Sequence, residues 1–122
     1  MNNKLDKNYK ITIITVTKNS ERHLEENILS VFNQTYKNYE HIIIDGDSED
    51  NTKNIIKKHI DKINYFISEP DKGLYYAMNK GIEKATGEII GILNSDDIYF
   101  PDALKIVNKY FLRDKNLDFL FG

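Results

Sequence analysis

The chain has 122 residues, the size of one domain, and it contains no cysteine, which excludes a disulfide framework and a thiolate metal site. Hydrophobic residues make up 40% of it, enough to bury a core, and 17 basic against 19 acidic side chains leave a net charge of −2. That balance argues against a dedicated nucleic-acid binder. The first seven residues lack the apolar core of a signal peptide, and no run approaches the roughly 20 apolar residues of a membrane span. We therefore expect a cytoplasmic protein.

Short apolar runs rich in β-branched residues alternate with segments of helical periodicity. Residues 11–16, ITIITV, predict a buried strand, because a strand that is covered on both faces need not alternate apolar and polar positions. Further strands are predicted at residues 41–44, 65–67, 88–93 and 117–121.

Four helices are predicted between these strands, each with an apolar face. The faces, in chain order, are Leu24, Ile28, Val31 and Phe32; Ile55, Ile56 and Ile60; Leu74, Met78 and Ile82, with the small Ala77, Gly81 and Ala85 beside them; and Leu104, Val107 and Phe111. Alternating strands and helices predict an α/β fold, with a mostly parallel sheet and helices on both faces. We expect one domain over residues 1–122, with residues 1–9 as an N-terminal tail.

Acidic residues follow the predicted strands. Asp45 and Asp47 come after the second strand, and the adjacent pair Asp96 and Asp97 comes after the fourth. In open α/β sheets ligands bind outside the carboxyl ends of the strands, where these side chains would gather. Adjacent carboxylates repel unless a cation or hydrogen bonds compensate, and such oxygen ligands suit Mg²⁺ or Mn²⁺. No glycine-rich phosphate loop is present, so the residues favour a nucleotide diphosphate held through a metal.

Four segments together resemble the family 2 inverting glycosyltransferases of the GT-A fold, in the right order and spacing from Lys10 onward. They are IITVTKN at 13–19, IIDGDSEDNT at 43–52, GLYYAMNKG at 73–81 with the following ATGEII at 85–90, and NSDD at 94–97. The last of these stands where the family has its D-x-D-type metal motif. The resemblance implies a Rossmann-like, nucleotide-binding half of a GT-A enzyme.

The resemblance also implies roles for particular residues. Asp45 would accept a hydrogen bond from the nucleotide base, and Val16 and Thr17 would line the base pocket, largely through their backbone. Asp96 would approach the ribose or the sugar. Asp97 would coordinate the Mn²⁺ or Mg²⁺ that bridges the diphosphate and neutralises the leaving group.

The implied reaction is metal-dependent transfer of a sugar, with inversion, from a nucleotide diphosphate donor such as a UDP-sugar. The acceptor is unknown, a sugar or a lipid-linked molecule, as in polysaccharide biosynthesis at the inner face of the membrane. The sequence departs from the family in having Ser95 in place of the first acid and Val16 where proline is common. We expect the acceptor-binding part and the general base to lie beyond Gly122, and the apolar strand predicted at 117–121 to favour self-association.

Two other interpretations remain open at this point. A signalling receiver domain has a similar length and an acidic metal site, but it needs an acid pair directly after the first strand, where this chain has Thr17, Lys18 and Asn19. The other interpretation is a nucleotide-binding fragment without catalysis.

Overall fold

Strands and helices alternate along the part of the chain that the computed structural model describes, residues 7–70 and 72–114. The strand predicted at residues 117–121 lies outside these ranges. The elements are β1 (Ile11–Thr17), α1 (Leu24–Phe32), β2 (Tyr39–Asp45), α2 (Thr52–Lys58), the 3₁₀ turn η2 (Ile60–Lys62), β3 (Tyr65–Ser68), α3 (Leu74–Lys84), β4 (Ile89–Ile92) and α4 (Ala103–Arg113). None of the helices within these ranges is both long enough and apolar enough to cross a bilayer.

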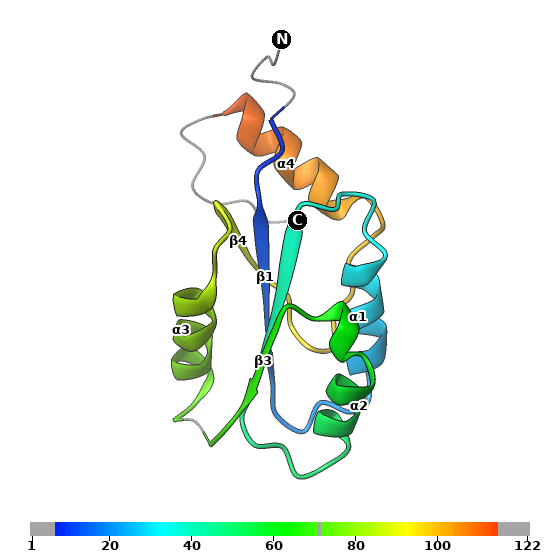
Figure 1. Ribbon diagram of the computed structural model, residues 1–122, viewed down its shortest axis with the longest axis vertical. Helices are drawn as coiled ribbons and strands as arrows, with labels where there is room; N and C mark the ends of the chain where they lie inside the picture. The colour runs from blue at the N-terminus through cyan, green and yellow to red at the C-terminus, as the bar shows by residue number, and fades with distance from the viewer. Residues whose placement is uncertain (1–6, 71, 115–122) are drawn as a thin grey trace.

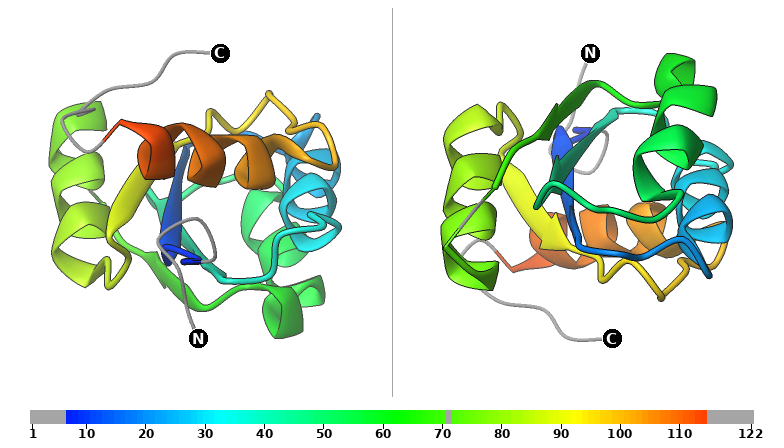
Figure 2. Two further views of the ribbon diagram at one scale, coloured as in Figure 1. Left: turned by 90° about the horizontal axis from the view of Figure 1, so that it is seen from above. Right: turned by 90° about the horizontal axis from the view of Figure 1, so that it is seen from below.

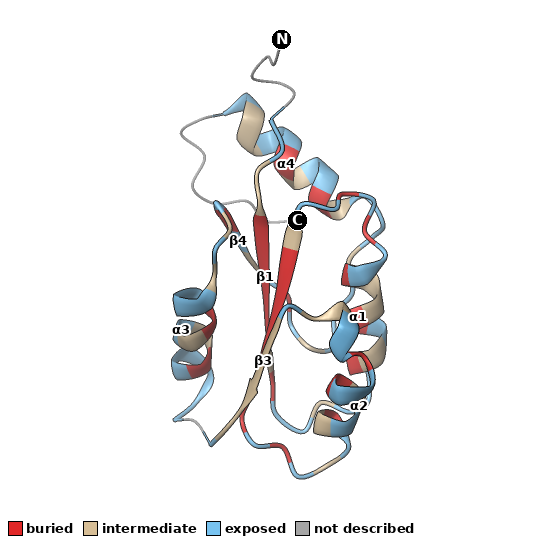
Figure 3. Cartoon of the chain, in the orientation of Figure 1, coloured by how far each residue is buried: buried red, intermediate tan, exposed pale blue. Residues whose placement is uncertain are grey.

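The strands form one parallel sheet in the order β3-β2-β1-β4 (Figure 1). This arrangement confirms the predicted α/β fold. Strands β1 and β2 are central and buried over nearly their whole length (Figure 3), which explains why neither alternates apolar with polar residues. Receiver domains have the flavodoxin-like order 2-1-3-4-5, so the observed order does not support that interpretation.

Helices cover both faces of the sheet, as predicted. Helices α1, α2 and α4 lie on one face, where Ile11, Ile13 and Ile43 of the central strands pack against them. Of the helices in the described ranges, α3 is the one on the other face, over Ile14 and the neighbouring apolar residues of β2 (Figures 1 and 2). Two separate apolar layers therefore fix the sheet from both sides.

The buried face of α3 is not the one that the sequence pattern predicted. Leu74 and Ile82 are 55% and 46% exposed, whereas Ala77 and Gly81 are buried. The reason is the close approach of α3 to the sheet: a Cβ atom on Gly81 would lie 2.7 Å from Cγ2 of Ile14. Only small side chains fit between helix and strand at that distance, so the larger apolar residues turn outward.

Two other residues predicted to be buried are also exposed. Phe32 ends α1 and is 41% exposed, with the Nζ atoms of Lys37 and Lys62 lying 5.9 Å and 5.2 Å from its ring centroid. Ile60 is 49% exposed because it lies in the short turn η2, after α2 has ended. The places of the helices were predicted correctly, but these terminal residues lie beyond the reach of the core.

The end of the predicted N-terminal tail is attached to the domain. The backbone N–H of Tyr9 donates to Oδ1 of Asn108 at 3.0 Å, and Lys7 pairs with Glu88 at 3.1 Å. These contacts lie at the amino end of β1, far along the strand from the loops that follow its carboxyl end.

Candidate functional site

The strand order reverses direction at β1. The chain passes from β1 outward to β2 and β3, then crosses back to place β4 on the other side of β1. Such a switch point leaves a crevice between the loops that follow the two strands, and this crevice is where open α/β sheets bind ligands. A hollow of about 400 Å³ lies there, lined by Asn19, Ser20, Arg22, His23, Ser95 and Asp96.

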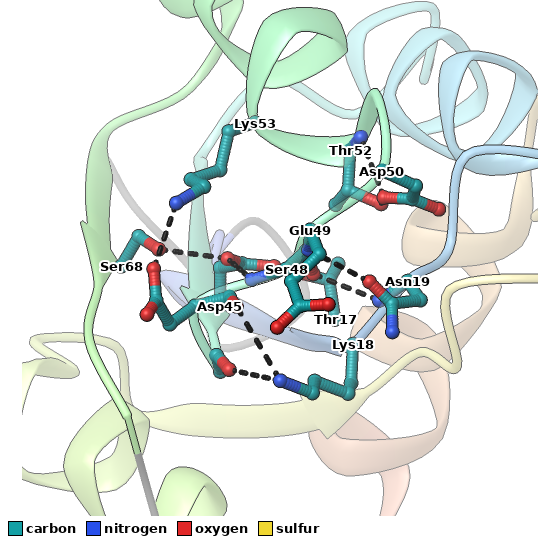
Figure 4. Close-up of polar contacts among 12 residues, drawn as sticks. Thr17, Lys18, Asn19, Asp45, Ser48, Glu49, Asp50, Thr52, Lys53 and Ser68 are labelled. Atoms are coloured by element: carbon teal, nitrogen blue, oxygen red, sulfur yellow. Dashed lines mark hydrogen bonds and ion pairs between the residues drawn. The ribbon is translucent and has the colours of Figure 1, made fainter.

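Asp45 ends β2 directly beside Thr17, the last residue of β1 (Figure 4). Its side chain is completely buried. Its Oδ1 accepts from the hydroxyls of Thr17 and Ser48, each at 2.6 Å. Its Oδ2 accepts from the backbone N–H of Ser48 at 2.9 Å and from the hydroxyl of Ser68 at 2.7 Å. All four acceptor positions of the carboxylate are thus filled by three different segments of the chain.

This set of donors keeps Asp45 ionised. Burial raises the pKa of its carboxyl, but the hydrogen bonds from Ser48, Thr17 and Ser68 outweigh burial, and the pKa lies below its ordinary value of 3.8. The negative charge is therefore stabilised chiefly by hydrogen bonds.

The loops after β1 and β2 are also joined to each other. The backbone N–H of Asn19 donates to the hydroxyl of Ser48 at 2.8 Å, and the Asn19 side chain accepts from the N–H of Glu49 at 2.9 Å. Nζ of Lys18 donates to the carbonyl oxygen of Gly46 at 2.7 Å (Figure 4). Asn19 has a φ of 49°, a left-handed conformation that asparagine tolerates better than most residues. The two loops therefore form one ordered wall of the crevice.

The adjacent acids after β4 lie in a tight turn. The N–H of Asp97 donates to the carbonyl oxygen of Asn94 at 3.0 Å, and the side chains of Asp96 and Asp97 are both exposed. The hydroxyl of Ser95 donates to that of Ser20 at 3.1 Å, which connects this turn to the loop after β1. The structure therefore presents both carboxylates to solvent beside the crevice, with Asp96 lining it.

The structure places the predicted site residues in two groups at this edge of the sheet. Val16, Thr17 and Asp45 lie at the ends of β1 and β2, and the side chain of Val16 packs toward the α3 face. Both the hydroxyl and the backbone of Thr17 make hydrogen bonds here. The hydroxyl donates to Asp45, and the carbonyl oxygen accepts from the N–H of Gly46 at 2.9 Å. Asp96 and Asp97 form the second group, across the switch point.

Sequence reasoning missed the polar residues that hold these groups in place. Ser48 and Ser68 complete the hydrogen bonds of Asp45, and Asn27 of α1 reaches the turn that carries Asp97. Asn27 was detectable as a polar residue beside the apolar face of a predicted helix. Nothing in the sequence showed that Ser68, at the end of a different strand, points to Asp45.

The carboxylates at the turn are oxygen donors of the kind that a divalent ion takes. Within residues 7–70 and 72–114, no three acidic or histidine side chains form a metal-binding cluster. Mg²⁺ and related ions are often held by one or two carboxylates together with phosphate oxygens of the substrate, so a full protein cage is not required. The exposed pair Asp96 and Asp97 supplies ligands of this kind.

A second hollow, of about 410 Å³, lies at the other end of the sheet. It is lined by Phe32, Lys37, Tyr39, Asp61, Lys62, Ile63 and Asn64, near the amino ends of β2 and β3. None of the residues predicted to bind nucleotide or metal lines it.

Similar proteins were found among curated sequences. Over 115 residues the chain is 34% identical to the E. coli UDP-Glc:alpha-D-GlcNAc-diphosphoundecaprenol beta-1,3-glucosyltransferase WfgD, covering 93% of this chain and 45% of WfgD. Over 98 residues it is 33% identical to the putative teichuronic acid biosynthesis glycosyltransferase TuaG of Bacillus subtilis, covering 78% of this chain and 39% of TuaG. The chain thus spans less than half the length of these relatives.

Solved structures share the fold. S. aureus TarS 1-349 in complex with UDP-GlcNAc superposes with a TM-score of 0.77 at 26% identity, over 84% of this chain and 31% of that one. The mannosyltransferase PcManGT from Pyrobaculum calidifontis, in complex with GDP-Man and Mn²⁺, has a TM-score of 0.76 over 87% of this chain and 33% of its own; at 23% identity it shows the fold alone. Residues 12–120 match the model of Glycosyl transferase family 2, and the chain belongs to that family.

Proposed function

We propose that this chain binds the nucleotide-sugar donor, of the UDP-sugar class, in a metal-dependent glycosyltransferase that inverts the configuration at the transferred sugar. The observation that carries the proposal is the exposed pair Asp96 and Asp97 at the β1/β4 switch point, in a chain of family 2. The UDP-GlcNAc bound to TarS and the UDP-Glc in the name of WfgD support the choice of donor. The diphosphoundecaprenol in that name supports a lipid-linked acceptor.

In this proposal, Asp97 holds Mn²⁺ or Mg²⁺ and Asp96 faces the ribose or the sugar. When bound, the ion supplies positive charge that stabilises the departing nucleoside diphosphate. An acceptor hydroxyl attacks the anomeric carbon from the face opposite the diphosphate. The new C–O bond forms as the bond between the anomeric carbon and the diphosphate oxygen breaks, and the nucleoside diphosphate leaves. The hydroxyl proton passes to a base, to which we assign no residue of this chain.

The base of the nucleotide would lie beside Val16, Thr17 and Asp45. Because the Asp45 carboxylate already accepts four hydrogen bonds, an N–H of the base must replace one of the present donors. The Ser68 hydroxyl is the best candidate, since Ser68 is only half-buried whereas Thr17 and Ser48 are buried. The other three hydrogen bonds then hold the carboxylate in place for the base.

Calorimetric titration of UDP, with and without Mn²⁺, tests the proposal. We expect Mn²⁺ to strengthen UDP binding, and D97A to weaken binding in Mn²⁺ at least about tenfold, because the variant removes a metal ligand. D61A is the matched control, since Asp61 is an exposed carboxylate at the opposite end of the sheet and its loss changes the net charge equally.

Two results would contradict the proposal. Either UDP fails to bind the wild-type chain in the presence of Mn²⁺, or D97A binds UDP in Mn²⁺ as tightly as the wild type does. Thermal melting of both variants checks that the fold is kept. Inversion is tested separately in the intact enzyme, from the anomeric configuration of the product by NMR.

A further inference from the structure

Two polar side chains of α1, and a third just after the helix, contact the segment that carries the acidic turn. Asn27 and Ser30 are three residues apart in α1, so they project on the same side of the helix, and Gln34 follows two residues after the helix ends. The hydroxyl of Ser30 accepts from the N–H of Tyr99 at 3.2 Å. The Gln34 side chain donates to the carbonyl oxygen of Phe100 at 2.6 Å and accepts from the N–H of Leu104 at 3.0 Å. Together they attach residues 94–104 to the helix.

Asn27 is the member of this group that reaches the turn itself. It is completely buried, and its Nδ2 donates to the carbonyl oxygens of Asn94 and Asp97, at 2.8 Å and 2.9 Å. These are the first and last residues of the turn closed by the Asp97 N–H. One side-chain amide therefore links both ends of the turn to the rigid middle of a helix.

The buried side chain of Asn27 carries a cost as well as two hydrogen bonds. Oδ1 of Asn27 is buried and has no hydrogen-bond partner among the described residues, which carries a desolvation cost. An apolar residue would avoid that cost, but it would leave the carbonyl oxygens of Asn94 and Asp97 without this donor. What asparagine adds here is the fixed placement of the two carbonyl groups.

We propose that Asn27 is a positioning residue, which fixes the backbone of the Asn94–Asp97 turn so that the Asp96 and Asp97 carboxylates are held ready for a divalent ion. This inference rests on the proposed function, because it assigns those carboxylates to the ion. Asn27 itself does not touch the ion or the donor. Groups that orient metal ligands typically change metal affinity by about 10–100-fold when they are removed, and we expect an effect in that range.

N27L tests this inference, because leucine has a similar size and cannot donate. The matched control is N108L: Asn108 of α4 is also a buried asparagine whose amide joins two backbone groups, Tyr9 N–H and the carbonyl oxygen of Lys7, at 3.0 Å and 3.2 Å. Those groups lie at the amino end of the sheet, away from the turn. Both variants lose comparable hydrogen bonds, so a general loss of stability affects them alike.

Three measurements on the full chain separate a positioning role from a structural one. Hydrogen exchange by NMR reports the Asp97 amide, which closes the turn; Mn²⁺ binding is followed by electron paramagnetic resonance; and thermal melting reports global stability. We expect N27L to speed exchange at Asp97 selectively and to weaken Mn²⁺ binding about 10–100-fold, whereas N108L lowers the melting temperature without either effect.

The inference is overturned if N27L binds Mn²⁺ as the wild type does, or if N27L and N108L lose Mn²⁺ affinity to the same extent. If N27L does not fold cooperatively, N27T is measured in its place, and a hydroxyl that can donate only one of the two hydrogen bonds should give a smaller loss in the same direction. Failure of the proposed function looks different. In that case the wild-type chain and D97A bind Mn²⁺ with UDP equally, or not at all.

Discussion

Replacing Asp45 with asparagine should destabilise the domain, although the two side chains have the same shape. The carboxylate meets only donors: the hydroxyls of Thr17, Ser48 and Ser68 and the backbone N–H of Ser48. An asparagine brings an NH₂ group into this set. That group fits best on the Oδ1 side, where two hydroxyls can rotate to accept, because on the other side it would oppose a backbone N–H that cannot rotate.

The cost of D45N follows from what remains after this rotation. The buried Thr17 and Ser48 hydroxyls can then no longer donate to residue 45, and a buried donor without a partner costs about 1–3 kcal/mol. The other hydrogen bonds change from charge-assisted to neutral and weaken by roughly half. Since desolvating the charge is no longer required, part of this loss is offset. We expect the free energy of unfolding to fall by about 2–4 kcal/mol.

Urea denaturation of the wild type, D45N and D47N measures this difference. Asp47 is an exposed residue of the same loop, with a 2.7 Å surface ion pair to Lys53, so D47N should cost less than about 1 kcal/mol. We expect a lower midpoint for D45N with an unchanged slope, which indicates a change in stability and not in the unfolded state.

The pH dependence provides a second check on Asp45. Its folded pKa lies below the ordinary 3.8, so its stabilising contribution is fully present above pH 3.8 and is lost as the pH falls through the folded pKa. The difference in unfolding free energy between the wild type and D45N should therefore be constant near neutral pH and shrink below pH 3.8. Equal stabilities of D45N and D47N at neutral pH would refute this account of the site.

Three further predictions concern the packing of the domain. G87A should cost roughly 1–3 kcal/mol in a urea melt, because a Cβ at Gly87 would lie 2.7 Å from the backbone nitrogen of Thr12, and a variant as stable as the wild type would show that the two segments can separate freely. A77L should destabilise by a similar amount while L74S changes stability by less than about 0.5 kcal/mol, and the reverse order would mean that the other face of α3 is buried. Burial lowers the pKa of His41 from 6.5 to about 3, so the unfolded chain takes up this proton first, and wild-type stability should fall as the pH drops from 6.5 toward 3. The stability of H41Q should fall less steeply over this range. If the unfolding free energies of H41Q and the wild type fall in parallel with pH, His41 is not the cause.

The order and type of the elements could be predicted because each depends on local pattern. Runs such as residues 11–16 are too apolar and too rich in β-branched residues to be anything but central strands, and their alternation with helical segments requires parallel pairing. The acids after β2 and β4 were predicted to meet at one edge because the carboxyl ends of parallel strands lie together. The structure has both groups at that edge.

Which face of α3 is buried depends on the distance between this helix and the sheet. The sequence shows two candidate stripes, one of large and one of small residues, and hydrophobicity alone favours the large one. The close approach of Gly81 to Ile14 decides for the small stripe. The distance between a helix and a sheet is set by all the side chains between them, so it cannot be read from the helix alone.

The sequence by itself determined which residue types stand at the carboxyl edge and hence the chemistry available there: hard oxygen ligands, no thiolate and no glycine-rich phosphate loop. Only the tertiary structure decided how these groups divide. Asp45 is buried with every acceptor position filled, whereas Asp96 and Asp97 are exposed on a turn that Asn27 holds from 67 and 70 residues away in sequence. A carboxylate acts as a structural acceptor or as an open ligand according to the donors that surround it, and those donors come from segments that only folding brings together.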